Sequence, residues 1–358
     1  MTDTPYLAVD AARVDRNLRT TAETARRAGV ALRPHAKTHK TAALAKRQID
    51  SGAIGLTVAT IGEAEAFVAA GFGDLFIAYP LWVTAHKGAR LRALAQQSAL
   101  RLAVDSIAGA ERMAAEVGGT GSGVEVLVEV DSGQHRTGVG PEFAGEVAAA
   151  AHDAGLDVIG VFTFPGHGYG PGGARSAAAR EEVTALAEAA DRLRSVSIEP
   201  RVRSGGSTPT VEFATDSDVL TEIRPGVYPF YDAQQIELGV CEFGDVALTA
   251  VSTVVHRDGH RAVLDAGSKI IGADRPAWAS GHGRILDDPD ARIVGLSEHH
   301  AVVEYPPSAV VPELGTTVGV IPNHVCTAVN LVDELVVDDA RSGGAADRWP
   351  VIARGANS

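Results

Sequence analysis

Two lysines and two histidines crowd the stretch LRPHAKTHKT at positions 32–41. Lys37 follows directly on an apolar run that predicts a short buried strand. An amine that is shielded from water can lose its proton and form an imine with a carbonyl compound. Lys37 is therefore a candidate for covalent catalysis. Taken alone, the stretch favours the plainer alternative, a solvated loop of His35, Lys37, His39 and Lys40.

A second candidate is the turn SGGSTP at positions 204–209. Gly205 and Gly206 allow backbone N–H groups to come close to an anion. Thr208 is predicted to cap the following helix and Pro209 to occupy its first position, which would make a phosphate site at the helix N-terminus. A lysine together with a phosphate cradle is what pyridoxal 5'-phosphate requires, because its aldehyde needs a covalent attachment and its ester an anchor.

A third candidate is His324-Val325-Cys326, after the predicted strand 316–322. In an extended segment residues i and i+2 point to the same side, so the imidazole and the thiolate could bind one cation together. Their softness favours Zn²⁺ over magnesium or manganese, and two protein ligands leave positions open for substrate and water. The spacing by itself is more typical of packing than of a metal site.

Alternating strands and helices are predicted for the first two thirds of the chain. Eight apolar runs bounded by turn residues read as strands, and most are separated by stretches of helical periodicity. This pattern predicts an α/β fold with an N-terminal (β/α)8 barrel, whose chemistry would lie at the C-terminal strand ends. The predicted strands are 30–36, 55–60, 74–79, 101–105, 124–130, 157–163, 201–204 and 221–224, and the predicted helices are 11–28, 41–50, 62–70, 84–97, 106–117, 141–154 and 173–194.

Strands without long helices follow after about residue 235, which predicts a C-terminal antiparallel β domain. The strands are expected at 247–257, 261–267, 301–305, 316–322 and 334–338. We therefore expect a cofactor-binding barrel at 11–234 and a β domain at 235–348 that also takes up a strand near 6–10. The tail from residue 341 onward is expected to be partly loose.

Composition excludes several classes of protein. The formal net charge of −13 and the lack of a basic run argue against nucleic acid as a partner. The N-terminus lacks a signal-peptide pattern, and no apolar segment reaches the roughly 18 residues of a membrane span, so we expect a cytoplasmic protein with no membrane partner. Only Cys241 and Cys326 are present, too few for a disulfide framework, and Cys241 is expected to be a buried apolar residue.

Seven motifs along nearly the whole chain carry a family resemblance: RPHAKTHK, DSGQHRTGV, PGHGYG, SGGSTPT, EIRPGVY, LDAGSK and PNHVCTAVNL. In this order they resemble the fold-type III pyridoxal-phosphate enzymes of the D-serine dehydratase and D-threonine aldolase family. The resemblance implies an alanine racemase-like architecture and a head-to-tail homodimer.

The resemblance also implies roles for individual residues. Lys37 is similar to the Schiff-base lysine, and Arg136 to the arginine near the phenolic oxygen of the cofactor. His167 and Tyr169 match polar groups close to the ring and the substrate. The positions that match the phosphate site are Gly205, Gly206, Ser207, Thr208 and Tyr228. Plainer alternatives are a strand-end salt bridge for Arg136, a surface position for His167 and core packing for Tyr228.

Function is implied by the same resemblance. Members similar to D-serine dehydratase have His-x-Cys with zinc, as at His324 and Cys326, whereas the aldolase branches have His-x-Asp with a harder metal. His300, in the pair with His299, matches a region near the site. The expected activity is a D-serine dehydratase that forms pyruvate and ammonia and also acts on other β-hydroxy D-amino acids.

Three alternatives remain at this point. A D-threonine or 3-hydroxy-D-aspartate aldolase would use the same residues to release glycine, or a related amino acid, plus an aldehyde. A non-catalytic pyridoxal-phosphate carrier is disfavoured by the second domain. A racemase is disfavoured because no motif supplies an opposing tyrosine and the metal pair would have no task.

Overall fold

The computed structural model describes residues 3–118, 121, 123–339 and 347–358. The chain divides into two compact units. The parallel-sheet unit comprises Thr21–Lys37, Gln48–Gly226 and Gly355–Ser358, and the antiparallel-sheet unit comprises Met1–Thr20, Thr38–Arg47 and Val227–Arg354. In the part of the chain that the structure describes, no helix combines the length and the apolar character needed to cross a bilayer.

Eight parallel strands form the sheet of the first unit, in the order β2-β9-β8-β7-β6-β5-β4-β3. Each lies within or close to a range predicted from apolar runs. An isolated parallel bridge between His35 and Thr57 connects the segment after β2 with β3. The predicted α/β class is confirmed, while closure as a (β/α)8 barrel stays a prediction. The strands are β2 (Ala31–Leu32), β3 (Leu56–Val58), β4 (Asp74–Pro80), β5 (Ala99–Val104), β6 (Val124–Glu129), β7 (Asp157–Phe162), β8 (Val202–Gly205) and β9 (Glu222–Ile223).

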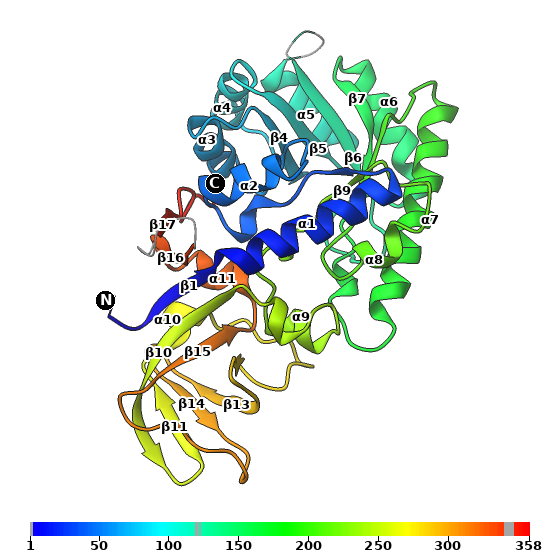
Figure 1. Ribbon diagram of the computed structural model, residues 1–358. Coiled ribbons are helices and arrows are strands. Elements are labelled where there is room, and N and C mark those ends of the chain that lie inside the picture. The colour runs from blue at the N-terminus through cyan, green and yellow to red at the C-terminus, as the bar shows by residue number, and fades with distance from the viewer. Residues whose placement is uncertain (1–2, 119–120, 122, 340–346) are drawn as a thin grey trace. The chain divides into compact units, whose positions relative to one another are not determined.

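Helices of this unit lie on the outer side of the strands (Figure 1). Their starts follow local sequence: the hydroxyls of Thr60, Thr84 and Ser106 accept backbone N–H groups at the N-termini of α3, α4 and α5. The helices are α1 (Ala11–Ala28) and α2 (Ala42–Asp50), which each extend over both units, and α3 (Ile61–Ala69), α4 (Ala85–Ala95), α5 (Ile107–Val117), α6 (Ala144–Asp153), α7 (Ala174–Ser195) and α8 (Val211–Ala214). Short 3-10 turns are η1 (Ala36–Thr38), η2 (Pro141–Phe143) and η3 (Gly166–Gly168).

A buried ion cluster ties several strands of the parallel sheet together. Arg33, after β2, is fully buried and donates to Glu222 on β9 at 2.8 Å and to Asp74 on β4 at 2.6 Å. Arg101 on β5 donates to the same Glu222 at 3.1 Å. Removing one partner of a buried ion pair would leave the other charge buried and unpaired, which is strongly destabilising. The cluster therefore favours the pairing of these particular β-strands.

The second unit is built on an antiparallel sheet. Six strands in the order β11-β14-β13-β12-β15-β10 close into a barrel, because β10 also pairs with β11. Strand β1 pairs antiparallel with β10 and parallel with β16, which extends the sheet. The predicted antiparallel domain is confirmed. Its strands are β1 (Tyr6–Asp10), β10 (Leu248–Asp258), β11 (Arg261–Leu264), β12 (Gly283–Ile285), β13 (Asp288–Leu296), β14 (Ala301–Glu304), β15 (Thr317–Pro322), β16 (Glu334–Asp338) and β17 (Asp347–Pro350).

Three strands of this unit were not predicted. Strands β12 and β13 carry charged residues and Pro289, which hide the strand pattern. Strand β17 lies in the tail that was expected to be loose, yet it pairs with β16, and Trp349 is 2% exposed. Residues 341–346 of that tail lie outside the described residues. The short helices are α9 (Ala233–Glu237), α10 (Ser268–Ile271) and α11 (Val325–Val329), with the 3-10 turn η4 (Phe243–Asp245).

Candidate functional site

Loops that follow neighbouring strands of the parallel sheet carry most of the predicted site residues. Lys37 follows β2, residues 205–208 end β8 and begin its loop, Tyr169 follows β7, and Arg136 follows β6. In the sheet, β2, β9, β8, β7 and β6 are consecutive and parallel. Their carboxyl ends therefore lie at one edge, where ligands of such sheets bind.

The ring of Phe164 is the common neighbour of three predicted residues. The Lys37 Nζ atom lies 5.4 Å and the Arg136 Cζ atom 5.2 Å from the Phe164 ring centroid. The Tyr169 ring lies 6.3 Å from the same ring, centroid to centroid. Aromatic faces attract cations at these distances, so Phe164 gathers the amine and the guanidinium. Sequence reasoning missed Phe164, although its place two residues after β7 was a usable signal.

Lys37 sits in η1, one turn after β2, and is half-buried. Its flanking residues are buried: His35 is 9%, His39 0% and Lys40 5% exposed. Each has a defined partner; for example, the Lys40 Nζ atom donates to Asn330 at 2.8 Å. The alternative of a solvated loop is therefore wrong.

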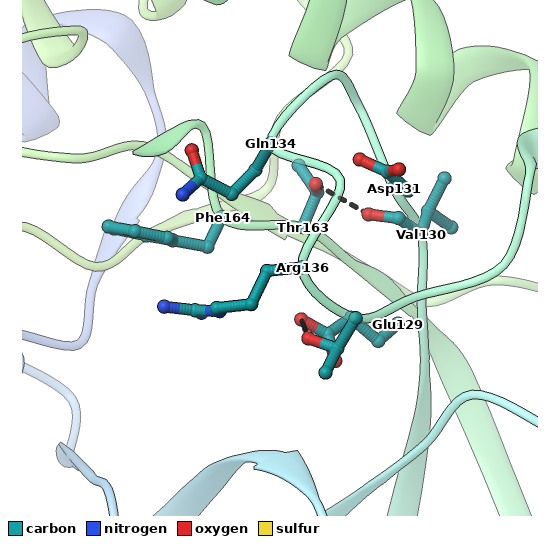
Figure 2. Close-up of a pocket in the computed structure, with 8 residues that line it drawn as sticks. Glu129, Val130, Asp131, Gln134, Arg136, Thr163 and Phe164 are labelled. Carbon is teal, nitrogen blue, oxygen red and sulfur yellow. Dashed lines mark hydrogen bonds between the residues drawn. The ribbon is translucent and has the colours of Figure 1, made fainter. Parts of the chain in front are cut away.

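A buried carboxyl group lines a small pocket beside Arg136. Glu129, the last residue of β6, is 3% exposed, and its Oε1 atom accepts a hydrogen bond from Thr137 at 3.0 Å. Its Oε2 atom is buried and has no partner among the described residues. Burial raises the pKa of Glu129 to about 7, against the opposing effects of Thr137 and Arg136. Figure 2 shows Arg136 beside Phe164, with Glu129 on the other side of the Arg136 side chain.

A buried glutamate on α7 accepts a backbone hydrogen bond from the turn after β8. The Gly206 N–H donates to Glu182 Oε2 at 2.7 Å, and Glu182, on α7, is fully buried. The Ser207 N–H donates to Thr210 Oγ1 at 3.0 Å. Gly206 has a φ of +73°, a conformation that side chains rarely adopt, which explains the glycine.

The predicted helix cap in this turn is wrong. The Ser207 carbonyl accepts the N–H groups of Thr210 and Val211, so the turn tightens before the helix begins. Thr210, not Thr208, precedes α8, and Pro209 lies in the turn. Because α8 has only four residues, it offers no helix N-terminus for a phosphate.

The donor groups of this edge nevertheless fit pyridoxal phosphate. A Cβ atom on Gly205 would lie 2.7 Å from Glu182 Oε2, so no side chain fits there and the turn stays compact. The buried hydroxyl residues Ser207 and Thr208 can donate to a phosphate ester. Lys37 supplies an amine for the aldehyde at the same sheet edge.

Two further predicted residues are held by contacts with other parts of the chain. The His167 Nε2 atom pairs with Glu181 Oε2 at 2.7 Å, and its ring lies beside Gly133. Tyr228 is 2% exposed in the apolar core of the antiparallel-sheet unit. These contacts are compatible with the plainer alternatives, and the roles of both residues at the cofactor stay predictions.

Arg224 is a buried cation that sequence reasoning did not single out. It follows β9, is 5% exposed, and donates from Nε to Ser204 Oγ at 2.9 Å and from Nη2 to the Thr163 carbonyl. Its guanidinium lies over the rings of Phe76 and Phe162. Burial lowers the pKa of Arg224 to about 10. Its position in EIRPGVY was the available signal.

His324 and Cys326 lie in the antiparallel-sheet unit. The extended conformation expected for the pair is wrong, because His324 is the N-cap of α11 and Cys326 lies in its first turn. The two side chains still interact. Burial lowers the pKa of His324, but the neighbouring Cys326 and Asp232 outweigh burial and raise this pKa well above its usual value. The Cys326 Sγ atom lies 3.2 Å from Thr38 Oγ1, and His324 Nδ1 lies 3.5 Å from Asp232 Oδ2.

These two donors fit a zinc ion with open positions. Imidazole and thiolate are ligands that zinc prefers. Within the described ranges, no group of three or more His, Cys, Asp or Glu residues is arranged to hold a metal.

The other residues considered in the sequence differ in their exposure to solvent. His299 and His300 lie exposed in the turn between β13 and β14. Cys241 is 8% exposed, as expected, and burial raises the pKa of its thiol.

Known protein families and individual relatives match nearly the whole length of the chain. The alanine racemase N-terminal domain matches residues 9–234, and a serine dehydratase domain matches residues 247–337. D-threo-3-hydroxyaspartate dehydratase from Delftia sp. is 34% identical over 90% of this chain and 91% of its own length. D-threonine aldolase from Arthrobacter sp. is 34% identical over 99% of this chain and 93% of its own.

Solved structures agree with these matches. Two structures of D-threo-3-hydroxyaspartate dehydratase, each 31% identical, superpose with a TM-score of 0.89. One is a cysteine-to-alanine mutant in the metal-free form, and the other is a histidine-to-alanine mutant. Each superposition covers 98% of this chain. It covers 97% of the cysteine mutant's chain and 95% of the histidine mutant's chain.

Proposed function

We propose a specific reaction from one premise: the chain belongs to the family that shares the alanine racemase N-terminal domain, and it is a pyridoxal-phosphate-dependent lyase acting on D-amino acids. The proposed reaction is dehydration of a β-hydroxy D-amino acid to a keto acid and ammonia. D-serine, which would give pyruvate, and D-threo-3-hydroxyaspartate are the substrates to test first.

Lys37, Arg136 and the turn after β8 would hold the cofactor. Bound pyridoxal phosphate supplies a sink for negative charge at the substrate Cα. Lys37 would bind the aldehyde covalently and, once displaced by substrate, its amine would accept the Cα proton. Ser207 and Thr208 would donate hydrogen bonds to the phosphate ester, and Arg136 would hold the phenolic oxygen.

His324 and Cys326 would hold zinc. A bound zinc ion supplies a Lewis acid for an oxygen that gains negative charge. In a dehydration, hydroxide leaves Cβ after the Cα proton is removed. The two protein ligands leave coordination positions open for an oxygen ligand of this kind.

The His324 and Cys326 pair is the observation that carries the proposal. The chain resembles dehydratases in having a thiolate where the aldolases have a carboxylate. Support comes from the relative whose cysteine-to-alanine mutant is metal-free: its two mutated positions are two residues apart, as His324 and Cys326 are. The aldolase alternative is retained because D-threonine aldolase matches 99% of this chain at the same identity.

Product analysis separates the two reactions. The purified enzyme, loaded with cofactor and zinc, is offered D-serine, D-threo-3-hydroxyaspartate and D-threonine separately. A dehydratase releases a keto acid and ammonia in equal amounts. Release of glycine and an aldehyde, without ammonia, would instead establish an aldolase.

The same resemblance supports two further parts of the proposal. We propose that the parallel strands close into a (β/α)8 barrel and that the enzyme is a head-to-tail homodimer. Light scattering of the purified protein tests the dimer: a mass near 37.1 kDa would show a monomer and contradict it.

A further inference from the structure

Asp232 is a buried carboxylate with several partners in the antiparallel-sheet unit. It is fully buried, and its Oδ1 atom accepts the Gln235 N–H at 3.0 Å as the N-cap of α9. Its Oδ2 atom accepts the Val325 N–H at 3.1 Å. Tyr231, immediately before it, has a φ of 50°, a left-handed conformation that costs energy in a residue with a side chain. The fold therefore places Asp232 in a defined position, directly after a residue with an unfavourable backbone conformation.

The carboxylate faces the ring of His324. The Oδ2 atom lies 3.5 Å from His324 Nδ1, at the outer limit of a hydrogen bond. The Nδ1 atom is buried and has no hydrogen-bond partner among the described residues. A carboxylate oxygen has two lone pairs, so Oδ2 can accept a second hydrogen bond while it holds Val325.

We propose that Asp232 is the positioning residue for His324, a role that rests on the proposed zinc site. An ionised carboxylate can only accept, so a proton on Nδ1 satisfies both groups. The lone pair of a neutral imidazole then lies on Nε2, which becomes the metal-binding nitrogen. Through Val325 and His324 together, Asp232 fixes both the backbone and the ring of the ligand. Carboxylate partners of this kind are common for zinc-binding histidines.

The variant Asp232→Asn tests the tautomer directly. Asparagine caps helices as well as aspartate does, so its oxygen keeps the bond to Gln235. Its amide NH₂ group replaces Oδ2, so it loses the hydrogen bond from the Val325 N–H and presents a donor to His324. A donor that faces Nδ1 favours the tautomer with the proton on Nε2. In this tautomer Nε2 has no free lone pair with which to bind a metal. We expect the zinc affinity of D232N to fall about 10- to 100-fold.

Asp265→Asn is the matched control. Asp265 lies in the same unit, and its carboxylate also accepts a backbone N–H, from Thr253 at 2.8 Å, and the hydroxyl of Ser252 at 2.7 Å. Among the described residues Asp265 forms hydrogen bonds with Thr4, Ser252 and Thr253 and none with His324, so D265N changes a carboxylate of this unit without touching the proposed ligand. We expect its zinc affinity to stay within about twofold of the wild type, so an affinity loss through general destabilisation would be recognised.

Zinc affinity is measured in full-length protein by competition with a chromophoric chelator, alongside the thermal midpoint of the metal-free form. Substitution with Co²⁺ adds a spectroscopic readout: the visible bands of D232N should change in position or intensity, and those of D265N should not. Should D232N not fold, D232S, which keeps a capping oxygen but no carboxylate, is measured in the same way.

The outcomes separate the inference from the proposed function. If D232N binds zinc as the wild type does while H324A and C326A do not, the inference is overturned and the zinc site stands. If neither H324A nor C326A weakens zinc binding, the proposed zinc site is itself wrong, and the inference with it.

Discussion

At the scale of single residues, Phe164 is the shared neighbour of three predicted site residues. The ring lies within reach of Lys37, Arg136 and Tyr169, each on a different loop or turn. An aromatic face attracts cations without forming a bond to them. Phe164 therefore brings the Lys37 amine and the Arg136 guanidinium to one place at the strand ends.

Replacing Lys37 should abolish covalent cofactor binding. In Lys37→Ala no amine remains at this position, so borohydride reduction followed by peptide mass spectrometry should find no cofactor adduct on peptide 32–41. Keto-acid formation should fall by several orders of magnitude. The control Lys269→Ala removes an exposed lysine that pairs with Glu298 at 2.7 Å. It should keep the adduct; an adduct that persists in K37A at another lysine would disprove the assignment.

Glu182 should make stability depend on pH. Burial raises its pKa from 4.5 to about 7, so between these values the folded protein holds a proton that the unfolded chain has released. The free energy of unfolding therefore falls as pH rises through this window. Glu182→Gln keeps an acceptor for Gly206 without titrating.

The thermal midpoints of E182Q and wild type measure this effect. The midpoint of E182Q relative to wild type should rise between about pH 5 and about pH 8, reflecting a gain in relative free energy of unfolding on the order of 1 kcal/mol or more. Glu199→Gln, whose side chain is 70% exposed, should show no such trend. A constant difference between E182Q and wild type across that range would contradict the raised pKa.

At the scale of elements, the turn after β8 is where local sequence was least informative. The Gly-Gly pair predicted a compact turn, which is present, but the helix cap was assigned two residues too early. Propensity rules could not show that Ser207 and Thr210 would bond to each other, or that Glu182 on α7 would hold Gly206. Both contacts require knowledge of residues brought together by folding.

The Gly206→Ala variant tests this turn. Alanine at a φ of +73° costs roughly 1–2 kcal/mol, and its Cβ would also lie 3.2 Å from Ile223. Gly172 is the matched control, because it has a φ of +68° and nothing within 4 Å of an added Cβ. We expect G206A to lose more stability than G172A and to release cofactor more readily in a dialysis assay. Equal behaviour of the two variants would remove the turn from the cofactor site.

At the scale of the whole molecule, hydrophobic patterns were enough to predict both sheets. The parallel strands appeared as short apolar runs, and β6 and β7, which are largely buried, were also rich in β-branched residues. In the antiparallel unit β12, β13 and β17 were missed, since Pro289 and several charges interrupt the apolar pattern of β12 and β13 and β17 lies in the charged tail. Lys37 could be found from its place after a strand. Phe164 was missed although it also follows a strand, and Glu129, Glu182 and Asp232 could not be found because their roles depend on partners distant in sequence.

Metal content measured beside turnover tests the central claim most directly. Loss of a β-hydroxyl is slow without a Lewis acid, which contributes several kcal/mol. Zinc-depleted enzyme and Cys326→Ala should therefore form keto acid orders of magnitude more slowly than zinc-loaded wild type, while exchange of the Cα proton with solvent continues. Added zinc should restore the depleted wild type but not C326A. A metal-free enzyme that produces keto acid and ammonia at the wild-type rate would contradict the account and return His324 and Cys326 to a packing role.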